Sequence, residues 1–327
     1  MSSDLPSTRV EADERPTAAQ RKRDQRRAAA AARAAAGRRA ARRRRLLLGV
    51  VAAASVAAVA AGVGVLILRV GSASAAGPAA APVVGGDLHT ITSVRGALFL
   101  GGHQGAAVSR DGGRKWRSLP SLEGADVMGW ATPPGAVLVG GHPGLYRSSD
   151  GGTSFTKVTG RADVPDAHAL GGAGSTVYLA SPEAGLMVST DAGRTWQNRS
   201  PSAGRSFMGT ILVDPRDPDR LVAPDMSGGI SASTDGGRTF SPLGGPMGAM
   251  AVTWNPANTR ELVAVGMSGA SRSTDGGRTW QDITVPPATS AITFDQTGRT
   301  LYAGALQGQQ GYAYRSTDGG RSWRPTA

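Results

Sequence analysis

The chain has 327 residues, 40% of them hydrophobic, and this length allows one large domain or two ordinary ones with a buried core. Its 47 glycines and its aromatic content of only 5% favour many short strands joined by tight turns over long helices. The absence of cysteine excludes a disulfide scaffold, a thiolate zinc site, an iron–sulfur cluster and a cysteine nucleophile.

The formal net charge of +12 is concentrated at the N-terminus. Residues 1–45 hold 14 Lys and Arg residues against five acidic ones, a balance of +9, whereas the rest of the chain carries only +3. A nucleic-acid-binding domain carries its basic patch on the folded part, so this distribution argues against nucleic acid as a partner. We expect residues 1–45 to be a disordered cytoplasmic tail whose basic residues contact anionic lipid.

An uncharged run, LLLGVVAAASVAAVAAGVGVLIL, follows Arg45. Its 23 residues would span about 34 Å as a helix, enough to cross a bilayer. The basic residues before it place the N-terminus in the cytoplasm. We therefore predict a transmembrane helix over 46–69, a linker over 70–85 and an extracytoplasmic domain over 86–327, in a single-pass protein of the cell membrane. A cleaved signal peptide remains the alternative, although its apolar segment is usually shorter.

Beyond the linker, an eight-residue phrase that ends in an aromatic residue occurs six times. The copies are SRDGGRKW, SSDGGTSF, STDAGRTW, STDGGRTF, STDGGRTW and STDGGRSW, and their aspartates are separated by 39, 41, 44, 40 and 43 residues. A period near 40 with strand-like segments between the turns predicts the blades of a β-propeller. These aspartates are Asp111, Asp150, Asp191, Asp235, Asp275 and Asp318.

Each phrase has the chemistry of a hairpin turn. The aspartate carboxylate can accept bonds from nearby backbone N–H groups, the glycines supply positive φ angles, and we expect the aromatic residue to pack on the returning strand. Because the six aspartates lie on separate blades, we interpret them as structural residues and not as catalytic or calcium-binding ones. The fold class that we predict is all-β, a six-bladed β-propeller.

The phrase resembles the Asp-box, or BNR, repeat S-x-D-x-G-x-T-W of sialidases, sortilin-type receptors and a photosystem II assembly factor. The resemblance covers about residues 86–327 and is strongest for bacterial proteins similar to glycosyl hydrolases. It implies the propeller fold but leaves the function open, because the boxes of this family lie away from its active sites and occur in enzymes and receptors alike.

Two ring positions on one face of the predicted propeller share an unusual composition. The start of each first strand and the end of each second strand hold all four histidines, His89, His103, His142 and His168, and five methionines, Met128, Met208, Met226, Met250 and Met267. Imidazole and thioether are soft, neutral ligands that suit copper, particularly Cu⁺, in a chain without cysteine. The alternatives are that methionine fills an irregular channel mouth while histidine makes ordinary hydrogen bonds, or that the histidines bind a sugar or small molecule.

Several carboxylates are predicted on the same face. Three of them precede a ring position by two residues, so along a strand they point to the same side and can orient an imidazole. A glycosidase needs two such groups, and the candidates for catalytic carboxylates are Asp87, Asp126, Asp166, Glu183 and Asp225.

These observations leave two hypotheses for function. The first is a membrane-anchored extracytoplasmic module that binds or assembles a ligand at this face, either a soft metal such as copper or a protein or glycan partner. The second is an exo-acting glycoside hydrolase, although the tyrosine nucleophile and the arginine cluster of true sialidases are not recognisable in the sequence.

Overall fold

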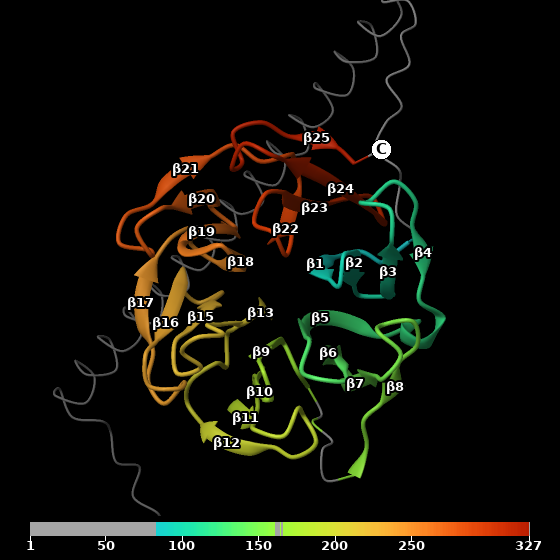
Figure 1. Ribbon diagram of the computed structural model, residues 1–327, viewed down its shortest axis with the longest axis vertical. Coiled ribbons are helices and arrows are strands. Elements are labelled where there is room, and N and C mark those ends of the chain that lie inside the picture. Colours follow the sequence, from blue (N-terminus) through green and yellow to red (C-terminus); the bar gives the residue numbers. More distant parts are fainter. Residues whose placement is uncertain (1–82, 161–163, 165, 327) are drawn as a thin grey trace, which may run out of the picture. The chain divides into compact units, whose positions relative to one another are not determined.

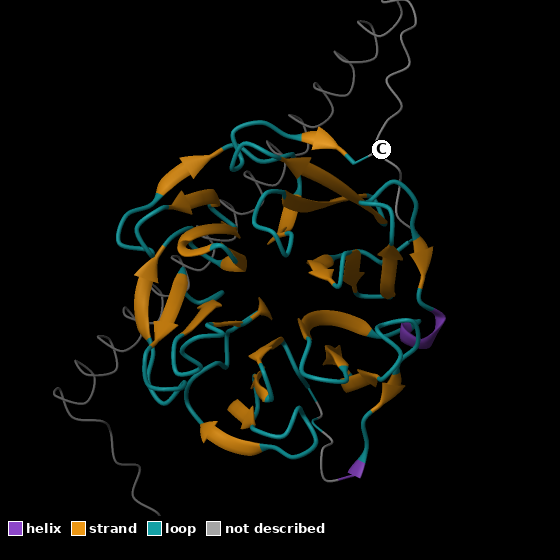
Figure 2. Ribbon diagram, in the orientation of Figure 1, coloured by secondary structure: helices purple, strands orange, loops and turns teal. Residues whose placement is uncertain are grey.

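In the computed structural model, the described residues are 83–160, 164 and 166–326, and they form a β-propeller with six blades around one axis (Figure 1). Strands make up nearly all of its regular structure (Figure 2). The predicted basic tail and transmembrane segment lie outside the described residues. Within the part of the chain that is described, no helix is long and apolar enough to cross a membrane.

Each blade is an antiparallel sheet whose strands follow one another in sequence from the axis to the rim. Blade 1 comprises β1 (Leu88–Val94), β2 (Ala97–Gly102), β3 (Gly105–Ser109) and β4 (Arg117–Ser118), and a 3₁₀ turn, η2 (Pro120–Leu122), leads to the next blade. Blade 2 comprises β5 (Asp126–Ala131), β6 (Val137–His142), β7 (Gly144–Ser148) and β8 (Thr156–Lys157). Blade 3 comprises β9 (Ala169–Ala173), β10 (Thr176–Ser181), β11 (Gly185–Ser189) and β12 (Gln197–Ser200).

Blades 4 to 6 repeat this order. Blade 4 comprises β14 (Leu212–Val213), β15 (Leu221–Pro224), β16 (Ile230–Ser233) and β17 (Ser241–Gly244), preceded by β13 (Gly209–Thr210). Blade 5 comprises β18 (Ala249–Asn255), β19 (Asn258–Gly266), β20 (Gly269–Ser273) and β21 (Gln281–Ile283). Blade 6 comprises β22 (Thr289–Phe294), β23 (Leu301–Gln307), β24 (Gln310–Ser316) and β25 (Arg324–Pro325). The predicted six-bladed fold is thereby confirmed.

The inner strand of blade 4 is divided between two sheets. Its first part, β13, pairs in parallel with β9 of blade 3, and only its second part, β14, pairs with β15. Glycine permits this close approach, since a Cβ on Gly171 would lie 1.6 Å from the carbonyl oxygen of Ile211, and one on Gly129 would lie 2.6 Å from that of Gly209. The inner strands of blades 2, 3 and 4 therefore crowd together at the axis.

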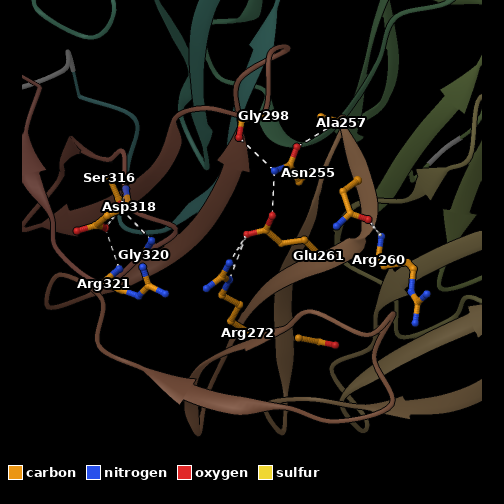
Figure 3. Close-up of polar contacts among 12 residues, drawn as sticks. Asn255, Ala257, Arg260, Glu261, Arg272, Gly298, Ser316, Asp318, Gly320 and Arg321 are labelled. Atoms are coloured by element: carbon orange, nitrogen blue, oxygen red, sulfur yellow. Dashed lines mark hydrogen bonds and ion pairs between the residues drawn. The ribbon is translucent and has the colours of Figure 1, made fainter.

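The six repeated phrases form turns that share the hydrogen bonds among serine, aspartate and the second glycine, as the last copy illustrates (Figure 3). The Ser316 hydroxyl donates to Asp318 Oδ1 at 2.7 Å and accepts the Gly320 N–H at 2.8 Å. Asp318 Oδ1 also accepts the N–H groups of Arg321 and Ser322. The Ser322 hydroxyl donates to Asp318 Oδ2 as well. This bond has the largest effect, and together the hydrogen bonds hold the pKa of Asp318 well below its usual range. The aspartates are thus committed to their own turns, in keeping with a structural role.

The aromatic residue of each turn belongs to, or packs against, a cluster of buried side chains that combines two neighbouring blades. Phe155 of blade 2 lies 5.9 Å from Trp130, which in turn packs 4.9 Å from Phe99 of blade 1. Similarly, Trp280 of blade 5 donates its indole N–H to the Leu243 carbonyl oxygen of blade 4 at 2.8 Å. Each of the six clusters therefore lies at a junction between neighbouring blades.

Residues near both ends of the described chain close the ring between blades 6 and 1. Val84 accepts the Gln104 N–H at 2.9 Å and donates its own N–H to Gln309 at 3.3 Å. On the outer side, the buried Thr326 hydroxyl lies 2.8 Å from the Gly113 carbonyl oxygen of the first repeated turn. Val84 falls in the segment that the sequence predicted as a linker, so the ring contacts begin before the first blade strand.

We expect Ser273→Ala to destabilise the propeller by about 1–3 kcal/mol, since it leaves a buried polar group unsatisfied. Ser273 is buried, and its hydroxyl accepts the Gly277 N–H at 2.8 Å and donates to Asp275 at 2.8 Å. Urea unfolding of the variant measures the loss, with the exposed Ser202→Ala as a control. An unchanged midpoint of unfolding would show that the serine of the turn does not contribute to the stability of the propeller.

Candidate metal site at the channel face

The starts of the inner strands and the loops between the second and third strands lie at the same end of the propeller channel. In blade 2, for example, Asp126 at the start of β5 is the register partner of His142 at the end of β6. In blade 1, the His103 N–H donates to the Asp87 carbonyl oxygen, which joins the same two parts of the blade. We call this end the channel face. The structure gathers all four histidines there, from blades 1, 2 and 3.

One group of donors is centred on Asp126. The Nε2 atom of His89 lies 3.1 Å from Asp126 Oδ1, and that of His103 lies 3.6 Å from Asp126 Oδ2. The two imidazole rings are tilted against each other with their centroids 4.7 Å apart. Asp87 completes the group, since one ligand atom each from Asp87, His89 and His103 lies within 4.8 Å of the others.

A second group is centred on Asp166. Its two carboxylate oxygens face the Nε2 atoms of His142 at 3.4 Å and of His168 at 3.2 Å. The same two nitrogen atoms are 3.0 Å apart. Two imidazoles and one carboxylate therefore converge on one point, with His142 supplied by blade 2 and His168 by the segment that precedes β9 of blade 3.

The spacing of the second group is close to that of a metal coordination sphere. Zinc binds imidazole nitrogen and carboxylate oxygen at about 2.0–2.2 Å, so two ligands of a tetrahedral ion are separated by about 3.3–3.5 Å. The two imidazole nitrogens are hydrogen-bonded to each other at 3.0 Å, and their separations of 3.4 and 3.2 Å from the two different oxygens of Asp166 lie near this range. An ion thus fits after small side-chain adjustments.

Some donor atoms lack hydrogen-bond partners among the described residues. His89 Nε2, Asp126 Oδ1 and Asp166 Oδ1 are buried and have no partner in hydrogen-bond geometry there. His89 Nε2 and Asp126 Oδ1 approach to 3.1 Å without the alignment that a hydrogen bond requires. Because buried polar atoms are usually satisfied, a cation between these two atoms would supply the missing partner.

The two central carboxylates have opposite pKa shifts. Burial raises the pKa of Asp126, but its contact with His89 and the charges of His89, His103 and His142 outweigh this, and the pKa lies below its usual value. Burial also raises the pKa of Asp166, and there it prevails over the opposing charges of two histidines. The pKa of His168 is lowered by burial, although the charge of Asp166 opposes the shift. A neutral imidazole is the form that binds metals.

The predicted methionines occupy several environments around the same channel. Met128 is buried in β5, Met208 and Met250 are partly buried, and Met226 and Met267 are exposed in the loops of blades 4 and 5. The histidines come from blades 1 to 3, whereas four of these methionines come from blades 4 and 5. The further ligand atoms beside the histidines are therefore carboxylate oxygens and not methionine sulfurs.

The remaining candidate carboxylates have other surroundings. Asp225 accepts bonds from the hydroxyl groups of Ser206 and Ser227 at 2.7 and 2.6 Å, while Glu183 is exposed and its charge contributes to the raised pKa of Asp166. The five tyrosines lie in β7, β10, β23 and β24 and not in the inner strands.

Two features of this site escaped the sequence reasoning. The sequence predicted that the aspartates two residues before a ring position point to the same side as that position and can orient an imidazole, and Asp166 does contact His168 in this way. Asp126, however, contacts two histidines of the preceding blade, and Asp166 also contacts one. The carboxylates therefore join neighbouring blades, an arrangement that depends on how the blades are staggered around the axis.

The channel narrows directly below the site. A cavity of only about 10 Å³ lies beside His89, between the inner strands. Ring-equivalent positions meet there, since a Cβ on Gly209 would lie 3.1 Å from the carbonyl oxygen of Met250 and 3.9 Å from those of His89 and Met128. At the opposite ends of the inner strands, a separate cavity of about 310 Å³ is lined by Trp130, among others. The inner strands therefore leave little space directly below the His/Asp site.

We expect Asp166→Asn to lower the pKa of His168 further, because the charge of Asp166 raises it in the native protein. NMR titration of the imidazole protons in chelator-treated protein measures this shift, and Asp225→Asn serves as the control carboxylate. A rise in the pKa of His168, or an unchanged pKa, would contradict the described contact between the two side chains.

Comparison with known proteins shows the fold but no family. No protein-family model and no curated protein matches the chain. Among solved structures, the chain is similar to a GH74 xyloglucanase from Xanthomonas campestris, with 19% identity and a TM-score of 0.52 over 74% of this chain and 45% of that one. It is also similar to a GH74 enzyme from Niastella koreensis, with 16% identity and a TM-score of 0.51 over 77% of this chain and 55% of that one.

A third similar structure is YCF48 from Cyanidioschyzon merolae, with 17% identity and a TM-score of 0.50 over 76% of this chain and 88% of that one. The chain spans about half the length of the two GH74 enzymes. At these identities, the likeness concerns the fold alone. The chain is a six-bladed propeller of the kind found in GH74 enzymes and in YCF48, as its resemblance to the Asp-box propellers predicts.

Proposed function

We propose that this protein is an extracytoplasmic binding module, anchored by its N-terminal helix, whose channel face binds a divalent transition-metal ion. The observation that supports the proposal most strongly is the grouping of all four histidines around Asp126 and Asp166. The anchor and the location follow from the sequence of the N-terminal segment and form part of the proposal.

The donor set decides which ions fit. Imidazole nitrogen and carboxylate oxygen suit borderline ions such as Cu²⁺ and Zn²⁺, and Cu²⁺ binds such sites most tightly among the divalent first-row ions. Copper thus remains the preferred metal, in its divalent form at the histidines. The carboxylates at the site give it a negative charge when the histidines are neutral, and this charge attracts a cation.

The two groups of donors predict two neighbouring sites. Each offers two imidazoles with at least one carboxylate, which leaves coordination positions for water or for a ligand atom of a partner. A bound ion would in this way tie blades 1, 2 and 3 together at the channel face and present an open position to solvent. This combination suits capture of a metal ion or metal-dependent binding of a partner.

We expect the purified full chain to bind Zn²⁺ and Cu²⁺ in calorimetric titration, and His89→Gln with His103→Gln to remove one of two bound ions. His142→Gln with His168→Gln should remove the other. The metal affinity of the fourfold variant should be lower by more than about 100-fold, since the loss of a group that only hydrogen-bonds to a metal ligand already lowers metal affinity by about 10–100-fold. Unchanged binding by a fourfold variant with native circular dichroism would refute the histidine site.

An exo-acting glycoside hydrolase is the second candidate. The observation that favours it is that Asp126 and Asp166 place two carboxylates at the same end of the channel, and a glycosidase needs two such groups. Each of them, however, contacts two imidazoles, an arrangement that suits a cation better than a glycosidic bond.

Chromogenic aryl glycosides separate the two candidates. The binding-module proposal predicts no turnover above that of the Asp126→Asn and Asp166→Asn variants, with or without Zn²⁺. Turnover by the native chain that both variants abolish would favour the hydrolase. The exposed Glu183→Gln variant controls for general effects of charge on this face.

A further inference from the structure

Three exposed methionines lie together on the half of the channel face that the histidines leave free. Met226, Met247 and Met267 are 41%, 60% and 77% exposed, and they make up three of the four large hydrophobic side chains that are exposed among the described residues. They come from the β15–β16, β17–β18 and β19–β20 loops of blades 4 and 5. We call these three residues the methionine cluster.

Backbone contacts hold two of these methionines side by side. The Met247 N–H donates to the Ser268 hydroxyl at 2.8 Å, and the Ser268 N–H donates to the Met247 carbonyl oxygen at 3.3 Å. Next to them, the Met267 N–H donates to the Gly248 carbonyl oxygen at 3.1 Å. The two loops thus run along each other and bring residues 247 and 267 together.

The position of the Met267 side chain depends on Gly248. A Cβ at residue 248 would lie 2.9 Å from Met267 Sδ, and the φ angle of Gly248 is +62°, which disfavours other residues. Glycine therefore leaves the thioether lying over the backbone of the neighbouring loop, on the side that faces solvent. Such a contact limits the motion of a side chain that otherwise has three freely rotating bonds.

The third methionine is connected to the same loops. The Gly248 N–H donates to the Gly228 carbonyl oxygen, two residues after Met226, and the Met226 N–H donates to the Ser206 carbonyl oxygen at 2.9 Å. Asp225 stiffens this loop, because its carboxylate accepts both the N–H and the hydroxyl group of Ser227. The loop that carries Met226 is therefore fixed from both sides of its turn.

At one of the ring positions, blade 5 carries methionine where blades 1 and 2 carry histidine. Met267 lies eight residues before its box aspartate, Asp275, as His103 and His142 lie before theirs. Blades 1 and 2 thus have an imidazole at a position where blade 5 has a thioether. Blades 1 to 3 thus place imidazoles at the channel face, whereas blades 4 and 5 place exposed thioethers there.

We propose that the methionine cluster is a second metal site, which binds the monovalent soft ion Cu⁺ through thioether sulfur. Thioethers select Cu⁺ over the borderline divalent ions that suit the histidines, so the two halves of the face hold different ions. The proposal goes beyond the metal site of the histidines and stands on separate residues. Exposure of the sulfur atoms leaves the cluster open to ion exchange with solvent.

The test compares the full chain with the Met226→Leu, Met247→Leu, Met267→Leu triple variant under reducing conditions. Leucine keeps the apolar surface and removes only the sulfur, so any effect on binding reports thioether ligation. Cu⁺ is supplied as its complex with bicinchoninate. The native chain should take up one more equivalent of Cu⁺ than the variant, and the affinity of the variant for Cu⁺ should be lower by about 100-fold or more. Ag⁺ is a second, redox-inert probe.

Controls separate this proposal from that of the histidine site. Met187→Leu removes a thioether from β11 of blade 3 and should leave Cu⁺ binding unchanged. The triple variant should still bind Zn²⁺, whereas the fourfold histidine variant should lose Zn²⁺ and keep the Cu⁺ equivalent that depends on methionine. Cu⁺ and Ag⁺ binding that survives in the triple variant would overturn the methionine site, whatever the result for Zn²⁺.

Discussion

The close approach of the inner strands at the propeller axis is the constraint on which the rest of the structure depends. Residues separated by about 40 positions become neighbours only because glycines such as Gly129 and Gly171 let one backbone lie against the next. The repeated turns and the six interblade cores hold the blades in this arrangement. Equivalent positions of successive blades therefore meet at the channel face, and a histidine of one blade contacts an aspartate of the next.

The fold could be predicted from the sequence because its signals are local and repeated. Serine, aspartate and glycine at fixed offsets determine each turn, and six copies at a period near 40 determine the number of blades. A turn also tolerates departures, as Ala192 shows by its φ angle of +63°, where most copies have glycine. The place of the aromatic residue in a cluster between two blades was not predicted, because the junction between blades is not encoded in the turn itself.

The site could be predicted only in part. The ring positions of His89, His103, His142 and His168 identified the face, since spacing alone aligns them. Contacts between blades depend on stagger and tilt, which the sequence does not express, so the contacts of Asp126 and Asp166 with histidines of the preceding blade were not predicted. Met247 escaped notice for a related reason, because it lies in a loop between blades and outside the two ring positions that were compared.

Together, these features describe a closed ring whose channel face carries histidines in some blades and exposed methionines in others. Buried and partly buried His/Asp donors occupy blades 1 to 3, and exposed thioethers occupy blades 4 and 5, above a channel that is almost closed. Such a face suits binding more than passage through the channel. The similar solved structures include enzymes as well as YCF48, which accords with a fold whose function is determined by the residues placed on it.

Anomalous X-ray scattering from crystals of the full chain loaded with Zn²⁺ would test the central claim most directly. The account predicts peaks at the zinc edge between His89, His103 and Asp126 and between His142, His168 and Asp166. Peaks found only elsewhere on the surface, or none at these two positions at full zinc loading, would contradict the assignment of the channel face as a metal site.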